Sequence, residues 1–91
     1  MTVRVNIHRY FLAETAGDWL VTEASGKTVG ECLKQVAGKI PQLNNALFDA
    51  DGNLKHHVSV FLNGDDAFPE ELAKEVNDGD VLDAIPVIGG G

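Results

Sequence analysis

The sequence contains only one cysteine and few basic residues, and each shortage excludes a class of protein. Cys32 has no second cysteine with which to form a disulfide, which agrees with a reducing compartment. Seven basic residues stand against 14 acidic ones, so the formal net charge is −7. A phosphate backbone would be repelled by such a surface. We therefore expect no nucleic-acid partner, and a basic protein partner fits the charge better.

Long apolar runs are also missing. No run approaches the roughly 18 residues that a membrane-spanning helix needs. The chain enters an alternating pattern at Val3, without the charged and then apolar layout of a signal peptide. These features predict a cytoplasmic protein with no membrane partner.

The length of 91 residues limits what the chain can contain. A single core commonly occupies roughly 50–200 residues, so one domain accounts for the whole sequence. Apolar residues make up 44% of the chain and charged residues 23%, which is typical of a globular domain. So short a chain has little room for an enclosed substrate cavity beside its core, which argues against a self-contained enzyme.

Alternation of apolar and polar residues predicts half-buried strands. The predicted strands lie at residues 3–8, 19–22, 57–62 and 81–87, with a short strand expected between the last two. The first two form an N-terminal hairpin, and Asn63-Gly64 predicts a tight turn after the third. Asp78-Gly79-Asp80 predicts a further turn before the last strand.

One segment carries the signature of an amphipathic helix. Thr28 and Glu31 have the spacing of a capping box, in which each side chain accepts a backbone N–H from the other residue. Pro41 is expected to end the helix. Residues 41–53 are expected to form a loop, and residues 70–76 a short helical turn. The stripe expected to face the core consists of Val29, Leu33, Val36, Ala37 and Ile40, with Cys32 beside it as small packing material.

The order of these elements predicts a two-layer α+β domain, with one helix packed on a mixed sheet of four to five strands. Order and size suit the β-grasp fold, with residues 1–88 as the domain and residues 89–91 as a C-terminal tail. If the helix covers one face, Phe61 and Ile85 lie on the other and form a candidate partner-binding patch. The alternative is that the adjoining loop covers Phe61.

The chain ends in Gly89-Gly90-Gly91, which is either an ordinary frayed terminus or a reactive arm. Glycine lacks a Cβ, so Gly89 and Gly90 could thread a narrow enzyme channel. Adenylation would convert the Gly91 carboxylate into an acyl donor. Attack by a sulfur nucleophile would then leave a C-terminal thiocarboxylate, a softer nucleophile than the carboxylate.

The chain contains an ordered set of short motifs that ends in this tail. They are Thr28-Val29-Gly30-Glu31, Pro41-Gln42-Leu43, Leu47-Phe48-Asp49, the segment from Val58 to Gly64, Asp78-Gly79-Asp80 and the segment from Ile85 to Gly91. With this set, the sequence resembles the MoaD/ThiS family of ubiquitin-like sulfur carriers over nearly its whole length. The resemblance implies that a MoeB/ThiF-like enzyme uses ATP to adenylate Gly91, and that a sulfur-accepting synthase subunit receives the sulfur. It implies no bound cofactor.

The length and the Asn63-Gly64 turn are more similar to MoaD, the small subunit of molybdopterin synthase, than to ThiS. This similarity implies a role in molybdenum cofactor biosynthesis. The glycine at position 89 and the segment of residues 65–69 depart from the usual MoaD pattern, so thiamin, cysteine or another sulfur-dependent synthesis stays open.

Two other functions fit the same sequence. A ubiquitin-like modifier would link Gly91 to lysines of target proteins after the same adenylation, and a non-catalytic interaction module would carry the tail incidentally. A metal site is not expected, because the adjacent His56 and His57 would point to opposite faces of a strand.

Overall fold

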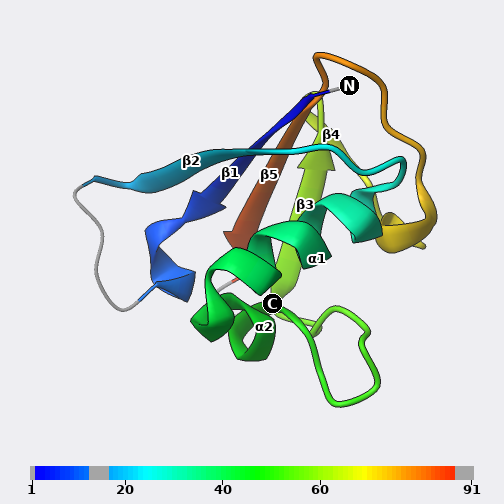
Figure 1. Cartoon of the computed structure of the whole chain (residues 1–91). Coiled ribbons are helices and arrows are strands. Elements are labelled where there is room, and N and C mark those ends of the chain that lie inside the picture. Colours follow the sequence, from blue (N-terminus) through cyan, green and yellow to red (C-terminus); the bar gives the residue numbers. More distant parts are fainter. Residues whose placement is uncertain (1, 13–16, 88–91) are drawn as a thin grey trace.

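Five strands form one mixed sheet, in the order β2-β1-β5-β3-β4, as Figure 1 shows. The structure is a computed structural model and describes residues 2–12 and 17–87. The central pair β1 and β5 is parallel, and the other pairs are antiparallel. The strands are β1 (Val3–His8), β2 (Trp19–Ala24), β3 (Val58–Leu62), β4 (Asp65–Asp66) and β5 (Val81–Pro86).

Two α-helices and two short 3-10 helices complete the fold, and α1 crosses one face of the sheet (Figure 1). This is the predicted β-grasp arrangement. The helices are η1 (Arg9–Phe11), α1 (Val29–Lys39), α2 (Pro41–Leu47) and η2 (Glu71–Ala73). Within the two described ranges, no helix has both the length and the apolar character that crossing a bilayer requires.

The core lies between α1 and the sheet, and its residues are those that the alternation predicts. Apart from the partly exposed strand ends Leu62 and Pro86, the inward positions of the central strands are at most 5% exposed, because each strand turns every second side chain toward the helix. The helix contributes its predicted stripe, from which only Ile40 is partly exposed. The buried sheet and helix residues are Val3, Val5, Ile7, Val58, Val60, Leu82, Ala84, Val29, Cys32, Leu33, Val36 and Ala37.

The start of α1 departs in one bond from the predicted capping box. The Glu31 N–H donates to Thr28 Oγ1 over 3.2 Å, as expected of an N-cap threonine. The Glu31 carboxylate, however, accepts the N–H of Lys27 over 2.9 Å rather than that of Thr28. The side chain therefore reaches one residue further back and ties the preceding loop to the helix.

The prediction of a loop from residue 41 to residue 53 is wrong for its first half, which forms α2. Pro41 ends α1 and also occupies the first turn of α2, where a missing backbone N–H costs nothing. Leu43 and Leu47, four residues apart, then fall on one helical face and are fully buried. The same proline therefore stops one helix and starts the next.

The turn after β3 is held by side chains as well as by its backbone. Asn63 and Gly64 have φ of 52° and 87°, as the predicted tight turn requires. Asn63 Oδ1 accepts the Val81 N–H over 2.9 Å, and Asn63 Nδ2 donates to Asp80 Oδ1 over 3.0 Å. This bond, together with the N–H of Asn77, lowers the pKa of Asp80. The start of β5 is thereby fixed to the end of β3.

The short helix η2 packs against the first turn of α1 at a glycine. A Cβ at Gly30 would lie 2.9 Å from the Leu72 carbonyl oxygen and 3.1 Å from the Leu72 Cβ. The first of these contacts is with backbone, which cannot turn aside as a side chain can. The predicted helical turn at residues 70–76 is thus shorter than expected, and it depends on this close approach.

Gly30→Ala is expected to lower the free energy of unfolding by about 1–3 kcal/mol, since the added methyl group overpacks the contact with η2. Gly38→Ala is the matched control, because Gly38 lies in the same helix with nothing within 4 Å of the built Cβ. That variant should gain up to about 1 kcal/mol from helix propensity. Urea unfolding of both variants measures the difference, and equal stabilities would contradict the close approach.

Candidate functional site

The described part of the chain ends just before the predicted reactive tail. Gly89, Gly90 and Gly91 lie outside the described residues. Val87 is the last residue inside them, and its N–H donates to the His57 carbonyl over 2.7 Å. Strand β5 is therefore paired as far as the description reaches, so the predicted patch residue Ile85 lies in a part of the strand that is paired with β3.

The predicted patch residues Phe61 and Ile85 lie together on the sheet face that α1 leaves uncovered. The register pairs Phe61 with Asp83 and Ser59 with Ile85, so Phe61 and Ile85 are diagonal neighbours on β3 and β5. Both side chains are half-buried, so the adjoining segment does not fully cover Phe61. The predicted orientation is confirmed, and their role in partner binding stays a prediction.

Two apolar residues of β2 extend this surface and were not predicted. Trp19 is 41% exposed and Val21 is 60% exposed. They pair with His8 and Asn6 of β1, whose side chains also point away from the core. The strand itself was recognisable from the sequence, but its register with β1 was not. We call Trp19, Val21, Phe61 and Ile85 together the open sheet face.

A polar pair lies in the middle of the open sheet face. Asn6 Nδ2 donates to Asp83 Oδ1 over 2.8 Å, across the parallel strands β1 and β5. The register places this pair between Val21 and Phe61, in one row that crosses the sheet. Asn6 Oδ1 is buried and has no hydrogen-bond partner among the described residues. Any surface that covers the row must therefore accommodate polar atoms between two apolar flanks.

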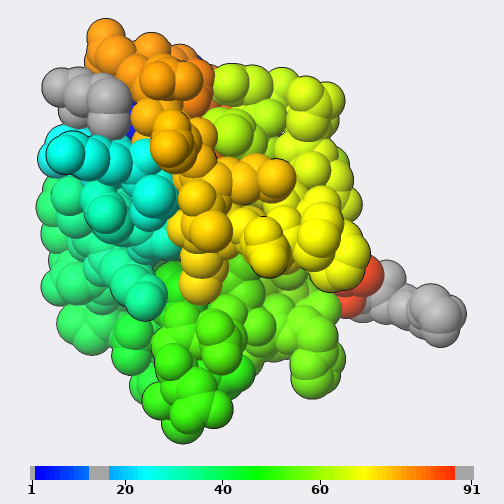
Figure 2. All heavy atoms as spheres, turned by 90° about the vertical axis from the view of Figure 1, so that its right-hand side faces the viewer, coloured from blue at the N-terminus to red at the C-terminus, as the bar shows by residue number. Residues whose placement is uncertain are grey.

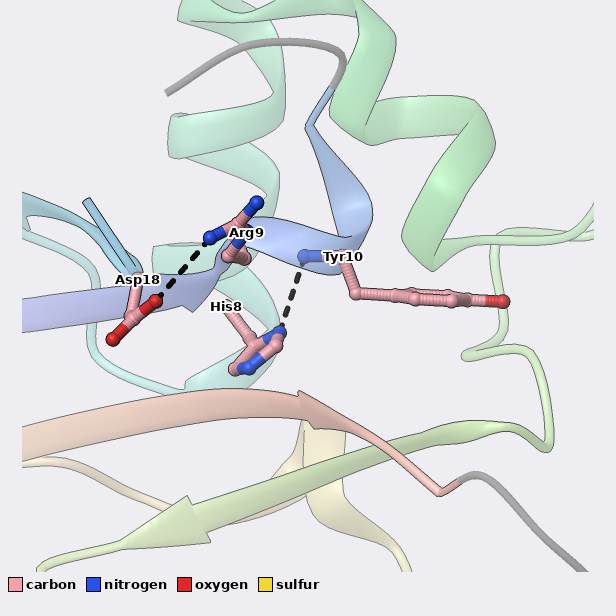
Figure 3. A network of polar contacts seen from close by, with 4 residues as sticks. All are labelled: His8, Arg9, Tyr10 and Asp18. Carbon is pink, nitrogen blue, oxygen red and sulfur yellow. Dashed lines mark hydrogen bonds and ion pairs between the residues drawn. The ribbon is translucent and has the colours of Figure 1, made fainter. Parts of the chain in front are cut away.

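The end of β1 is fastened to β2 by a small network, shown in Figure 3. The Tyr10 N–H donates to His8 Nδ1 over 3.1 Å, which holds the His8 ring in place. That ring meets Trp19 edge to face, with centroids 5.3 Å apart. The Arg9 guanidinium reaches Asp18 over 3.4 Å, but both side chains are exposed, so this ion pair adds little stability. The network fixes Trp19 on the open sheet face.

The lone cysteine is a packing residue, as predicted. Cys32 is 0% exposed, and burial raises the pKa of its thiol, so the reactive thiolate is disfavoured. Of the adjacent histidines, His56 is exposed and His57 half-buried. In the part of the chain that the structure describes, no group of three or more histidine, cysteine, aspartate or glutamate residues is arranged to hold a metal ion.

Comparison with known proteins gives consistent matches. The family model described as the ThiS family matches residues 11–91. Small archaeal modifier protein 1 of Haloferax volcanii is 37% identical over 82 residues, which cover 88% of this chain and 91% of that protein. The sulfur carrier protein CysO of Mycobacterium tuberculosis is 30% identical over 94 aligned positions, covering 100% of both chains.

A solved structure supports the same relationship. One chain of the BexX/CysO complex of Amycolatopsis orientalis superposes with a TM-score of 0.72 and 27% identity. The superposition covers 96% of this chain and 99% of that one. That similar chain was solved together with a partner protein.

Proposed function

The chain belongs to the ThiS family, and we propose that it is a sulfur carrier whose C-terminal Gly91 is adenylated and converted to a thiocarboxylate. The observation that carries this proposal is the extent of the family match, which runs through residue 91 and so includes the whole glycine tail. The CysO relative, a sulfur carrier by name, adds alignment over the full length of both chains. The chain is then a protein co-substrate rather than an enzyme.

The chemistry needs two steps at one carbonyl. A Gly91 carboxylate oxygen attacks the α-phosphate of ATP, pyrophosphate leaves, and an acyl adenylate forms. A sulfide or persulfide sulfur then attacks the Gly91 carbonyl carbon and AMP departs. With sulfide this gives the thiocarboxylate directly, whereas with a persulfide a thiol must cleave the S–S bond. The thiocarboxylate that results is a better nucleophile than the original carboxylate.

Partner proteins would supply the other parts of the reaction. We assign the ATP site and the catalysis to a MoeB/ThiF-like activating enzyme, with Gly89 and Gly90 threading its channel. A sulfur-accepting synthase subunit would receive the product. Use of ATP and the single cysteine agree with a cytoplasmic location. The molybdopterin pathway stays a prediction, since neither curated relative named above carries that function in its name.

A second function has support from one relative. Small archaeal modifier protein 1 shares 37% identity with this chain, more than CysO does. As a modifier, the chain would pass through the same adenylate, and a lysine amine of a target protein would then attack the Gly91 carbonyl to form an isopeptide bond. The two functions therefore differ only in the nucleophile that follows adenylation.

Intact-mass spectrometry separates these outcomes. The purified chain is incubated with a ThiF-like activating enzyme, ATP and sulfide. A rise of about 16 Da, from replacement of one oxygen by sulfur, is expected for the carrier. In cells of the native host, a ladder of lysine conjugates would instead favour the modifier. Both functions would be contradicted if the chain gained no mass and if the activating enzyme, with the chain as substrate, catalysed no exchange of pyrophosphate with ATP.

The open sheet face gives a separate prediction about docking. Phe61→Ser should weaken binding to the activating enzyme by about tenfold, because a buried aromatic anchor commonly contributes more than 1 kcal/mol to an interface. Val21→Ser, at a 60% exposed position, should also weaken it without lowering the melting temperature. Gly38→Ala, on the helix over the opposite face, is the control. Isothermal titration calorimetry with the enzyme measures all three, and unchanged affinities for both serine variants would rule out this face.

A further inference from the structure

A groove with an apolar floor lies on the side of the molecule that Figure 2 faces, along the outer edge of the sheet. Its volume is about 660 Å³, and its walls are the segments of residues 53–59 and 66–73. Leu54, Val58 and Leu72 supply apolar surface. We call this feature the edge groove. Its walls contain none of the four residues of the open sheet face.

The edge groove exists because β4 stops early. This strand has two residues, which pair with Phe61 and Leu62. One further bond, from the Ala67 N–H to the Val60 carbonyl, follows before the chain turns away. On the side of β3 that faces away from β5, no described strand pairs with Val58 and Ser59, and the space beside them forms the groove.

Phe68 forms one wall of the edge groove and points largely into solvent. It is 72% exposed, the highest value among the large apolar side chains that the structure describes as exposed. Its backbone is nonetheless fixed, since the Phe68 N–H donates to Asp66 Oδ1 over 2.9 Å. An exposed aromatic side chain on a fixed backbone loses little conformational freedom on binding, which is typical of interface residues.

The charge around the edge groove is mainly negative. Asp66, Glu70 and Glu71 line it, against Lys55 and His56 on the facing segment. Among the described residues, the one ion pair joins Arg9 and Asp18, so the groove carboxylates are not neutralised by salt bridges there. A second copy of this chain would bring the same acids and a further net charge of −7, and it would be repelled. A basic partner would be attracted.

We propose that the edge groove binds an extended segment of a partner protein in which an apolar side chain is flanked by lysine or arginine. The apolar side chain packs on Phe68 and Leu72, and the basic ones face Asp66, Glu70 and Glu71. The open sheet face stays free in such a complex, because none of its four residues lines the groove. A partner in the groove would therefore leave that face open to a second protein. The proposal does not depend on which nucleophile reacts at Gly91.

The test is a titration of the ¹⁵N-labelled full chain with two synthetic peptides, followed by amide chemical shifts. One peptide alternates leucine with lysine and arginine, and the other replaces each basic residue by glutamate. We expect saturable shifts in residues 54–56 and 66–73 with the basic peptide only, weakened at high salt. Phe68→Ser should lower its affinity about tenfold, whereas Val21→Ser, an exposed apolar position on β2, should leave it unchanged.

Four outcomes of the peptide titration would overturn the proposal. They are the absence of saturable shifts at millimolar peptide, equal binding of the acidic peptide, unchanged affinity in Phe68→Ser, and shifts confined to the open sheet face. Shifts of the groove amides on dilution of the chain alone would also overturn it, since they would identify a second copy as the occupant. Because Phe68 is 72% exposed, its replacement should not unfold the chain, and an unchanged melting temperature checks this.

Discussion

Removal of Gly90 and Gly91 is expected to abolish adenylation and thiocarboxylate formation, with a loss of at least about 100-fold in the rate of pyrophosphate exchange. Two residues span up to about 7 Å, so the new terminal carboxylate would stop far short of the ATP phosphate. A misplacement of about 1 Å can already cost 100-fold in rate. The exchange assay uses the activating enzyme at a fixed concentration with each form of the chain as substrate.

The folded body should survive this truncation. The last hydrogen bond described for β5, from the Val87 N–H to the His57 carbonyl, lies before the deleted residues. The melting temperature should therefore change by no more than a degree or two, in keeping with the small role of most chain ends in stability. Gly91→Ala is the matched control, because it keeps the length and adds one methyl group, so its loss should be smaller. Truncated protein that is activated as fast as the full chain would contradict the proposed role of the tail.

Leu33→Ala should have the largest effect on stability, lowering the free energy of unfolding by about 3–5 kcal/mol. Leu33 is among the largest side chains that are fully buried, at 0% exposure, and it lies in the middle of α1. Its truncation loses apolar contact and leaves a cavity that a packed helix and sheet cannot close. For a domain of this size the loss is a large fraction of the total stability.

Urea unfolding followed by circular dichroism measures this loss. Lys39→Ala is the control, since Lys39 is an exposed residue of the same helix, and it should change the stability by less than about 1 kcal/mol. If Leu33→Ala and Lys39→Ala had the same free energy of unfolding, α1 would not pack against the core as described. The Leu33→Ala variant keeps an intact tail. Its rate of adenylation should therefore fall only in proportion to the fraction of the protein that is folded.

Much of the fold follows from local sequence rules. The period of two in β1, β3 and β5 identifies the inward residues, and these are buried except at the strand ends Leu62 and Pro86, which are partly exposed. Thr28 and Pro41 correctly mark the two ends of α1. The pair Asn63-Gly64 predicts its turn because both positions need positive φ, which the structure gives them. In each case, the physical cause lies within a few residues of the chain.

What the sequence does not reveal depends on pairing between distant segments. In the sequence, Pro41 predicts only the end of a helix, because whether a new helix begins there depends on a core into which Leu43 and Leu47 can pack. Trp19 and Val21 join the open sheet face only once the register of β2 with β1 is known. The edge groove needs the length of β4 and the path of residues 66–73 together. The predicted reactive residues, Gly89 to Gly91, are evident from the sequence and lie outside the described residues.

The position of β5 has a mechanical consequence. This strand precedes the tail and is paired along both sides, with β1 through residues 81–84 and with β3 through residues 82–86. If an activating enzyme pulled on the tail, as proposed, a force along β5 would load both ladders in shear, and many hydrogen bonds would share the strain at once. Peeling, in which bonds break one after another, would need a pull across the strands. The folded body would therefore resist unfolding while an enzyme held the tail.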